Sequence, residues 1–293
     1  MLVPVFCLVG LGYLIGPRLQ IESRTLSRFS FYILTPAYII DTLSTAQIAP
    51  VLAARMTLYT AVVHVGCALL ALVIALLLRR SPQMVAAYVL IAVFGNVGNF
   101  GLPIVQFAYG PDAQGIATVY FLAILTLSLI IGLGAATWNT GGRLQSIITV
   151  LCTPAIIALA PALLINTFDI TLPVPIARIF TLLASALVPV MLIALGVQLT
   201  TVTQWSFTSD TLIVTAIRLL GGAALAVALA PLFDIGGIER NIGVLQAAMP
   251  TAVLASIIAI EHDLLPDFVI SAVLFSTLAS VLTLTIILSL LGV

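Results

Sequence analysis

The chain has 293 residues, of which 62% are hydrophobic and 7% carry a charged side chain. A soluble domain carries about 25% charged residues, so this composition excludes an ordinary soluble protein and indicates an integral membrane protein. The formal net charge is zero, which argues against a nucleic-acid partner. All basic residues are arginine, so chemistry that needs a lysine Schiff base is excluded.

Apolar runs separated by charged residues, glycine or proline predict an all-α membrane protein with ten transmembrane helices. A helix needs about 20 residues to cross the hydrocarbon core. The first run lacks a basic segment and a small-residue cleavage site, so we interpret it as a span and not as a signal peptide. The predicted spans are Leu2–Gly16, Leu26–Thr45, Arg55–Leu78, Met84–Ala108, Gly115–Trp138, Ser146–Phe168, Pro175–Leu199, Thr211–Phe233, Asn241–Ile260 and Pro266–Leu291.

The two halves of the chain resemble each other. Residues 1–138 hold the first five spans, residues 139–145 form a short cytoplasmic loop, and residues 146–293 hold the second five. An odd number of spans in each half gives the halves opposite orientations, which is an inverted repeat. Three pairs of residues recur about 150 positions apart, as such a repeat requires: Pro36 with Pro189, Pro103 with Pro250, and His64 with Arg218.

The arginine residues predict the orientation in the membrane. With both termini outside, the connections on the inner side contain six arginines and those on the outer side three. An excess of basic residues marks the cytoplasmic side, so we expect both termini outside and the protein in the cell (inner) membrane.

The segment Phe94–Val105 interrupts the fourth predicted span. It reads Phe-Gly-Asn-Val-Gly-Asn-Phe-Gly-Leu-Pro-Ile-Val and combines two asparagines, three glycines and a proline. Proline removes a helical hydrogen bond, and main-chain groups that are freed in hydrocarbon need other partners. The segment therefore predicts a broken helix around a buried polar site. Pro250 predicts a second break in the ninth span.

Two motifs carry a resemblance to a known family. Gly-Asn-x-Gly-Asn-x-Gly-Leu-Pro at Gly95–Pro103 resembles the fourth-span signature of the auxin efflux carrier family. Val188-Pro189 with Ala194–Leu199 is similar to its seventh-span signature. The short central loop resembles that of a compact bacterial member.

The resemblance implies a carrier of organic anions, either auxin-like acids or carboxylates such as malate and malonate. It also implies that broken helices four and nine cross at their prolines. Helices 1, 2, 6 and 7 would form a scaffold, and helices 3–5 and 8–10 a moving transport part. We expect the substrate at this crossing, with contributions from Asn96, Asn99, Gly101, Pro103, Gln246, Pro250, Thr251 and Arg218.

Several of these residues have a simpler interpretation. Asn96 and Asn99 can form ordinary hydrogen bonds between membrane helices. Arg218 is either a guanidinium fork for an anion or a side chain that snorkels to the interface. His64 is either a proton-linked switch or a core histidine. Related bile-acid-type symporters use an acidic residue near the ninth-span crossing, where this chain has Gln246, so a sodium site of that kind is not expected.

The sequence thus predicts a secondary transporter of small organic anions that works by elevator-type alternating access. The alternatives are a sodium- or proton-coupled bile-acid-type symporter and a non-transporting membrane sensor. We expect no enzyme activity, cofactor or metal site, because the spans contain neither paired carboxylates nor a catalytic His/Ser arrangement. The expected partners are the small organic anion substrate and the lipid bilayer. The sequence does not decide whether the protein forms a homodimer.

Overall fold

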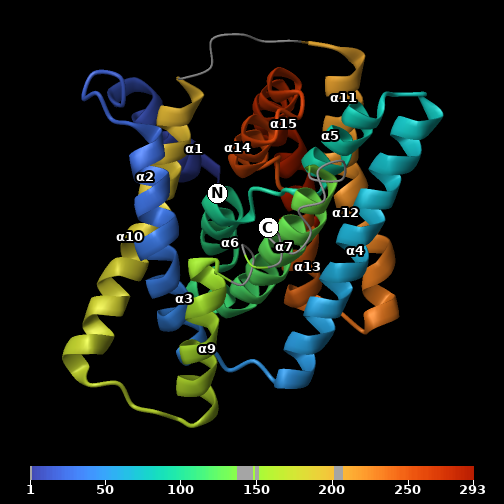
Figure 1. Cartoon of the computed structure of the whole chain (residues 1–293). Helices are drawn as coiled ribbons and strands as arrows, with labels where there is room; N and C mark the ends of the chain where they lie inside the picture. The colour runs from blue at the N-terminus through green and yellow to red at the C-terminus, as the bar shows by residue number, and fades with distance from the viewer. Residues whose placement is uncertain (1, 137–147, 149–151, 201–206) are drawn as a thin grey trace. The chain divides into compact units, whose positions relative to one another are not determined.

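The computed structural model describes residues 2–136, 148, 152–200 and 207–293 (Figure 1). Within these ranges the ordered elements are helices, and an isolated bridge joins Gly95 to Thr251. The predicted all-α class is confirmed, whereas the arrangement as a ten-span inverted repeat stays a prediction. The expected cytoplasmic loop 139–145 lies outside the described residues.

The described residues divide into two compact units. The first unit takes its residues from Met1–Ile48, Gly98–Thr118 and Leu151–Thr203. Its elements are α1 (Leu2–Ile15), α2 (Ser23–Phe29), η1 (Ser30–Leu34), α3 (Thr35–Ser44), α6 (Leu102–Tyr109), η3 (Pro111–Ala113), α9 (Pro154–Thr167) and α10 (Val174–Leu199).

The second unit takes its residues from Ala49–Val97, Val119–Val150 and Gln204–Val293. Helices α7 and η2 run from one unit into the other. The elements of the second unit, with these two, are α4 (Pro50–Leu77), α5 (Pro82–Val93), η2 (Val97–Gly101), α7 (Gln114–Ala136), α11 (Ser209–Ala216), η4 (Ile217–Gly221), α12 (Gly222–Leu229), η5 (Ala230–Phe233), α13 (Gly237–Ala247), α14 (Val253–Glu261) and α15 (Pro266–Leu290).

Among the described residues, five helical segments are long and apolar enough to cross a membrane. Shorter apolar helices coincide with other predicted runs, including α5 and α9. The chain is therefore a membrane protein. The five long segments are Pro50–Leu77, Pro111–Ala136, Val174–Leu199, Ser209–Phe233 and Pro266–Leu290.

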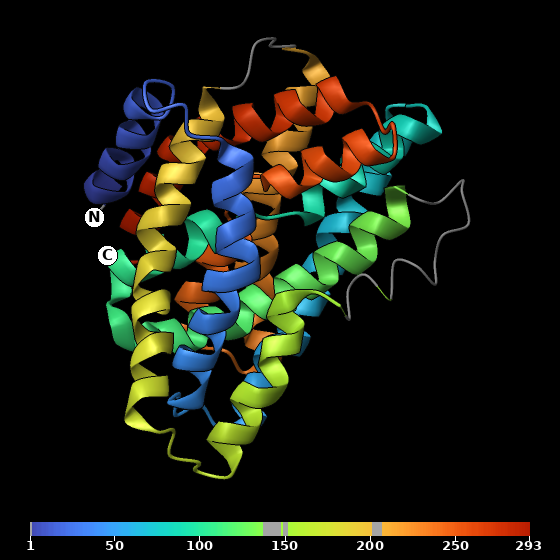
Figure 2. The same cartoon turned by 60° about the vertical axis from the view of Figure 1, so that its left-hand side comes forward.

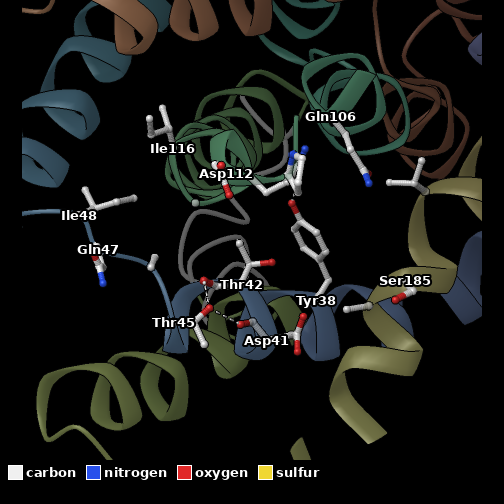
Figure 3. Close-up of a pocket in the computed structure, with 16 residues that line it drawn as sticks. Tyr38, Asp41, Thr42, Thr45, Gln47, Ile48, Gln106, Asp112, Ile116 and Ser185 are labelled. Carbon is white, nitrogen blue, oxygen red and sulfur yellow. Dashed lines mark hydrogen bonds between the residues drawn. The ribbon is translucent and has the colours of Figure 1, made fainter. Parts of the chain in front are cut away.

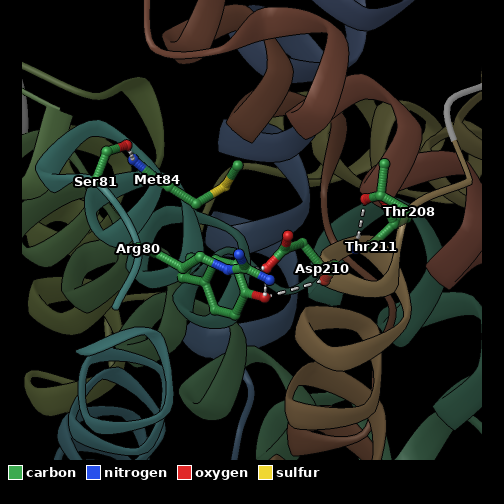
Figure 4. Close-up of polar contacts among 7 residues, drawn as sticks. Arg80, Ser81, Met84, Thr208, Asp210 and Thr211 are labelled. Carbon is green, nitrogen blue, oxygen red and sulfur yellow. Dashed lines mark hydrogen bonds and ion pairs between the residues drawn. The ribbon is translucent and has the colours of Figure 1, made fainter. Parts of the chain in front are cut away.

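In the second unit, α4 runs antiparallel to the segment α11–η4–α12. Near the start of α4, Arg55 pairs with Asp234 at 2.8 Å, just after η5. Beyond its other end, Arg80 pairs with Asp210 at 2.9 Å in the first turn of α11 (Figure 4). Tyr88 donates to the same Asp210 carboxylate at 2.5 Å. The Arg55 pair contributes little to stability because it is exposed to solvent. The half-buried cluster of Arg80, Tyr88 and Asp210 therefore holds the two helices together more strongly.

In the first unit, α3 packs between α9 and α10, and α1 packs along α10 (Figures 1 and 2). The α1–α10 contact is close because glycines face the neighbouring backbone. A side chain at Gly12 would collide with the Ile193 carbonyl, and one at Gly196 with the Val9 carbonyl. Small residues of this kind allow membrane helices to approach closely.

The glycine contact predicts a position-specific loss of stability. Gly12→Ala should lower the thermal unfolding temperature of the purified protein in detergent, because the added methyl group meets main-chain atoms that cannot move aside. Gly10→Ala, on the same helix, is the control because a Cβ at Gly10 meets nothing within 4 Å. We expect this control to keep or raise the unfolding temperature, since alanine is the better helix former. Equal losses in both variants would contradict the packing.

Candidate substrate site at two paired helix interruptions

Two helices of the second unit are interrupted, and their interruptions pair with each other. Helix α5 ends at Val93, and α13 ends at Ala247, six residues before α14 begins at Val253. Between these ends the two chain segments form a short antiparallel bridge. The Asn96 N–H donates to the Pro250 carbonyl, and the Ala252 N–H donates to the Phe94 carbonyl, both at 2.7 Å.

The position of the fourth-span break corrects the sequence prediction. The crossing on this segment lies at Phe94–Asn96, not at Pro103. Pro103 lies inside a helical segment that η2 and α6 form together, because Gly101 between them also has helical dihedral angles. The chain is thus helical on both sides of Pro103, and a π-helical turn precedes the proline. In the ninth segment, by contrast, Pro250 lies within the pairing itself. The prediction of a crossing at both prolines is therefore wrong for Pro103.

Neighbouring helices satisfy further main-chain groups at the interruption. The Ser128 hydroxyl of α7 donates to the Val93 carbonyl at 2.6 Å. The Ser276 hydroxyl of α15 accepts the Thr251 N–H at 3.1 Å and donates to the Val273 carbonyl at 3.0 Å. These hydroxyls replace the water that a loop would use at a protein surface. Two neighbouring helices, α7 and α15, thus hydrogen-bond to the main chain at the interruption.

Arg218 ties the two helix ends together. Its Nε donates to the Met249 carbonyl at 2.8 Å, its Nη1 to the Ala92 carbonyl at 2.7 Å, and its Nη2 to the Ala247 carbonyl at 3.1 Å. The residue is 0% exposed and therefore does not snorkel to an interface. Its positive charge faces the C-terminal ends of α5 and α13, which carry partial negative charge.

The backbone around Arg218 is a π-helical turn, η4. Such turns often occur at functional sites in membrane and soluble helices. The corresponding residue of the other half, His64, lies in the regular helix α4, where its Nδ1 contacts the Thr60 carbonyl at 3.2 Å. The two residues that the predicted repeat matches therefore differ in backbone conformation and in contacts.

Several buried polar atoms of the second unit have no hydrogen-bond partner among the described residues. They are Nδ2 of Asn96, both amide atoms of Gln246, Nε2 of His64 and Oγ1 of Thr215. Asn96 is 3% exposed and Gln246 is 0% exposed. Burying an amide without a partner costs about 1–3 kcal/mol, so these atoms are candidates for hydrogen bonds to a ligand.

The remaining residues predicted for the site belong to the first unit. Asn99 and Gly101 lie in η2, and Pro103 lies in α6. The structure thus brings together Asn96, Pro250, Thr251 and Arg218 in one unit, with Gln246 one turn before Pro250. A shared site that includes Asn99, Gly101 and Pro103 stays a prediction.

A separate cavity of about 630 Å³ lies within the first unit, and sequence reasoning missed it. Tyr38, Asp41 and Thr42 of α3 line one side, and Asp112 faces them across the cavity (Figure 3). The Tyr38 hydroxyl donates to the Gln114 side chain, and none of the predicted site residues lines the cavity. Its polar residues come from three stretches far apart in sequence, residues 38–47, 106–114 and 185, so no local motif indicates it.

The role of Ser276 predicts a stability difference between adjacent residues. Ser276→Ala should destabilise the protein by about 1–3 kcal/mol, because the buried Thr251 N–H loses its acceptor. Thr277→Val is the control, since the Thr277 hydroxyl bonds only to Val273 of its own helix. Thermal unfolding in detergent measures both variants. An equal or larger loss in Thr277→Val would show that the hydroxyl at the interruption has no special role.

Comparisons with known proteins identify a family for the chain. The sequence profile of a family described as "membrane transport protein" matches residues 1–143 and 140–288. An uncharacterized transporter of Methanothermobacter thermautotrophicus is 29% identical over 192 residues, which are 64% of this chain and 62% of that protein. An uncharacterized transporter of Methanocaldococcus jannaschii is 22% identical over 96% of this chain and 95% of its own length. The chain belongs to this family of membrane transport proteins, the auxin efflux carrier family.

Proposed function

We propose that the protein is a secondary transporter of small organic anions and that its substrate binds at the paired interruptions of the second unit. The observation that supports the proposal is a buried crossing that contains the Arg218 guanidinium and side-chain amide atoms of Asn96 and Gln246. These amide atoms have no hydrogen-bond partner among the described residues. Buried polar groups of this kind in a membrane protein are functional-site candidates.

The chemistry of the crossing suits a carboxylate. The amides of Asn96 and Gln246 can donate hydrogen bonds without a permanent charge. Thr251 lies just before the N-terminus of α14, where main-chain N–H groups and the helix dipole favour negative charge. No acidic residue lies in the segments 90–105 and 241–256 that contain the interruptions. Carboxylates such as malate or malonate, or an auxin-like acid, therefore fit better than cations.

We propose further that transport proceeds by elevator-type alternating access, with the second unit carrying the site. The division into two compact units supports this mechanism, because one part must move while the other stays in place. The pairing at Phe94–Asn96 and Pro250–Ala252 lies wholly within the second unit, so the site would move as one body. The arginine distribution supports a place in the cell membrane with both termini outside.

Proton coupling is a second candidate that one observation favours. His64 is 1% exposed, and its Nε2 has no partner among the described residues. A histidine that took up a proton when the carrier opens its site to water would link transport to a proton gradient. In that case His64→Gln would abolish accumulation against a gradient while leaving exchange of substrate across the membrane intact.

The proposed site predicts which amides matter for binding. In a thermal-shift and binding screen against malonate, malate and indole-3-acetate, Asn96→Ala and Gln246→Ala should each weaken the best ligand by about tenfold or more, because a hydrogen bond to a charged group contributes about 1.5–3 kcal/mol. Gln106→Ala is the control, because Gln106 is an exposed amide that lines the cavity of the first unit.

Loss of binding in Gln106→Ala with none in Asn96→Ala would move the site to that cavity and contradict the proposal. Proteoliposomes that contain the same ligand then distinguish the functions. Passage of radiolabelled ligand in the absence of sodium supports the carrier, a strict sodium requirement supports a bile-acid-type symporter, and binding without passage supports a sensor.

A further inference from the structure

Arg218 lies in a cage of main-chain oxygens. The carbonyls of Ala92, Ala247 and Met249 surround its guanidinium at 2.7–3.1 Å, and all three belong to the ends of interrupted helices or to the interruption itself. In carriers with broken helices, unwound carbonyls and half-helix C-terminal ends are the groups that coordinate sodium. We propose that Arg218 is a tethered cation that occupies such a cage, so that the anion site is complete without sodium.

The charges around the cage support this assignment. Two ion pairs occur among the described residues, Arg55–Asp234 and Arg80–Asp210, and neither includes Arg218. A helix C-terminus carries roughly half a negative charge, so the ends of α5 and α13 together present about one. The guanidinium balances this charge. Without a cation in the cage, a carboxylate at the crossing would meet the repulsion of both helix ends.

The cage is fitted to the guanidinium at Gly95. A Cβ at this position would lie 2.5 Å from Nη2 and 3.1 Å from Cζ of Arg218. The guanidinium can move aside only by giving up hydrogen bonds to the cage carbonyls. A glycine at the crossing therefore permits the close approach of Arg218, and Gly95→Ala would displace the guanidinium while leaving the three carbonyls in place.

A purely structural clamp and a tethered cation make different predictions. A structural clamp links α5 and α13 through the shape and hydrogen bonds of the Arg218 side chain. If that is its only role, a small cation in solution cannot replace the side chain after Arg218 is removed. A tethered cation leaves behind a cation-binding cage when it is removed. The part of the inference that concerns anions rests on the proposed function, whereas the cage itself can be tested without any organic ligand.

The experiment measures unfolding temperatures in sodium chloride and in choline chloride at equal ionic strength, for the wild type, Arg218→Ala and the control Arg80→Ala. The wild type should not distinguish the two salts. Arg218→Ala should unfold at a lower temperature and be restored in a saturable manner by sodium or by millimolar guanidinium. Arg80→Ala removes an arginine from the half-buried pair in the same unit and should show no such restoration.

A stabilisation of the wild type by sodium that choline does not give would overturn the proposal. So would an Arg218→Ala variant that responds to neither sodium nor guanidinium. If Arg218→Ala does not fold, Gly95→Ala takes its place, because its cage is intact and its guanidinium displaced; a sodium response there supports the proposal, and no response overturns it.

Binding of malonate, added as its choline salt, separates this inference from the proposed function. Arg218→Ala should bind malonate about tenfold more weakly than the wild type, in line with the loss of one charge interaction of about 1.4 kcal/mol, and guanidinium should recover the affinity. Arg218→Lys should retain more affinity than Arg218→Ala, because it keeps a charge in the cage. Cation rescue of stability without carboxylate binding in any form would support the cage and overturn the anion site.

Discussion

The structure depends on one constraint of the membrane interior: a main-chain group that leaves a helix must find another partner inside the protein. At the crossing, the two interrupted segments provide main-chain partners for each other. The Asn96 N–H donates to the Pro250 carbonyl, and the Ala252 N–H donates to the Phe94 carbonyl. Arg218 donates hydrogen bonds to three further carbonyls at the interruption, which take no part in this pairing. Among the described residues, Nδ2 of Asn96 and the side-chain amide of Gln246 are left without a hydrogen-bond partner, and these atoms define the candidate site.

Arg218 and His64, which the predicted repeat matches with each other, have different surroundings. Arg218 lies in a π-helical turn and spans to both helix ends, whereas His64 lies in a regular helix and contacts its own Thr60. One half thus places a permanent charge at the matched position and the other a titratable ring. An inverted repeat gives two equivalent positions, and a carrier can use one for structure and charge and the other for regulation.

Much of this arrangement could be predicted from the sequence. Helices lie where the apolar runs predicted them, because the length and hydrophobicity that a membrane helix needs are properties of composition alone. The Gly/Asn/Pro cluster correctly indicated an interruption near residue 95. It did not locate the interruption, because a membrane helix tolerates proline, and only the tertiary pairing shows that the chain leaves the helix at residues 94–96 and not at Pro103.

Long-range contacts were beyond the reach of the sequence. Nothing local in Ser128 or Ser276 distinguishes them from hydroxyl residues that bond within their own helix, as Thr277 does. The cavity of the first unit likewise combines residues of α3, α6, η3, α7 and α10, which share no motif. Arg218 was predicted to contact a ligand, and its three main-chain partners became visible only when the helix ends were placed around it.

A cryo-electron microscopy map of the protein with its tightest-binding carboxylate tests the central claim most directly. We expect ligand density beside the pairing of Asn96 with Pro250, with helix α5 ending at Val93 and the guanidinium of Arg218 enclosed by carbonyls. Continuous helices through residues 94–96 and 248–252, or ligand density only in the cavity next to Tyr38, would contradict the account.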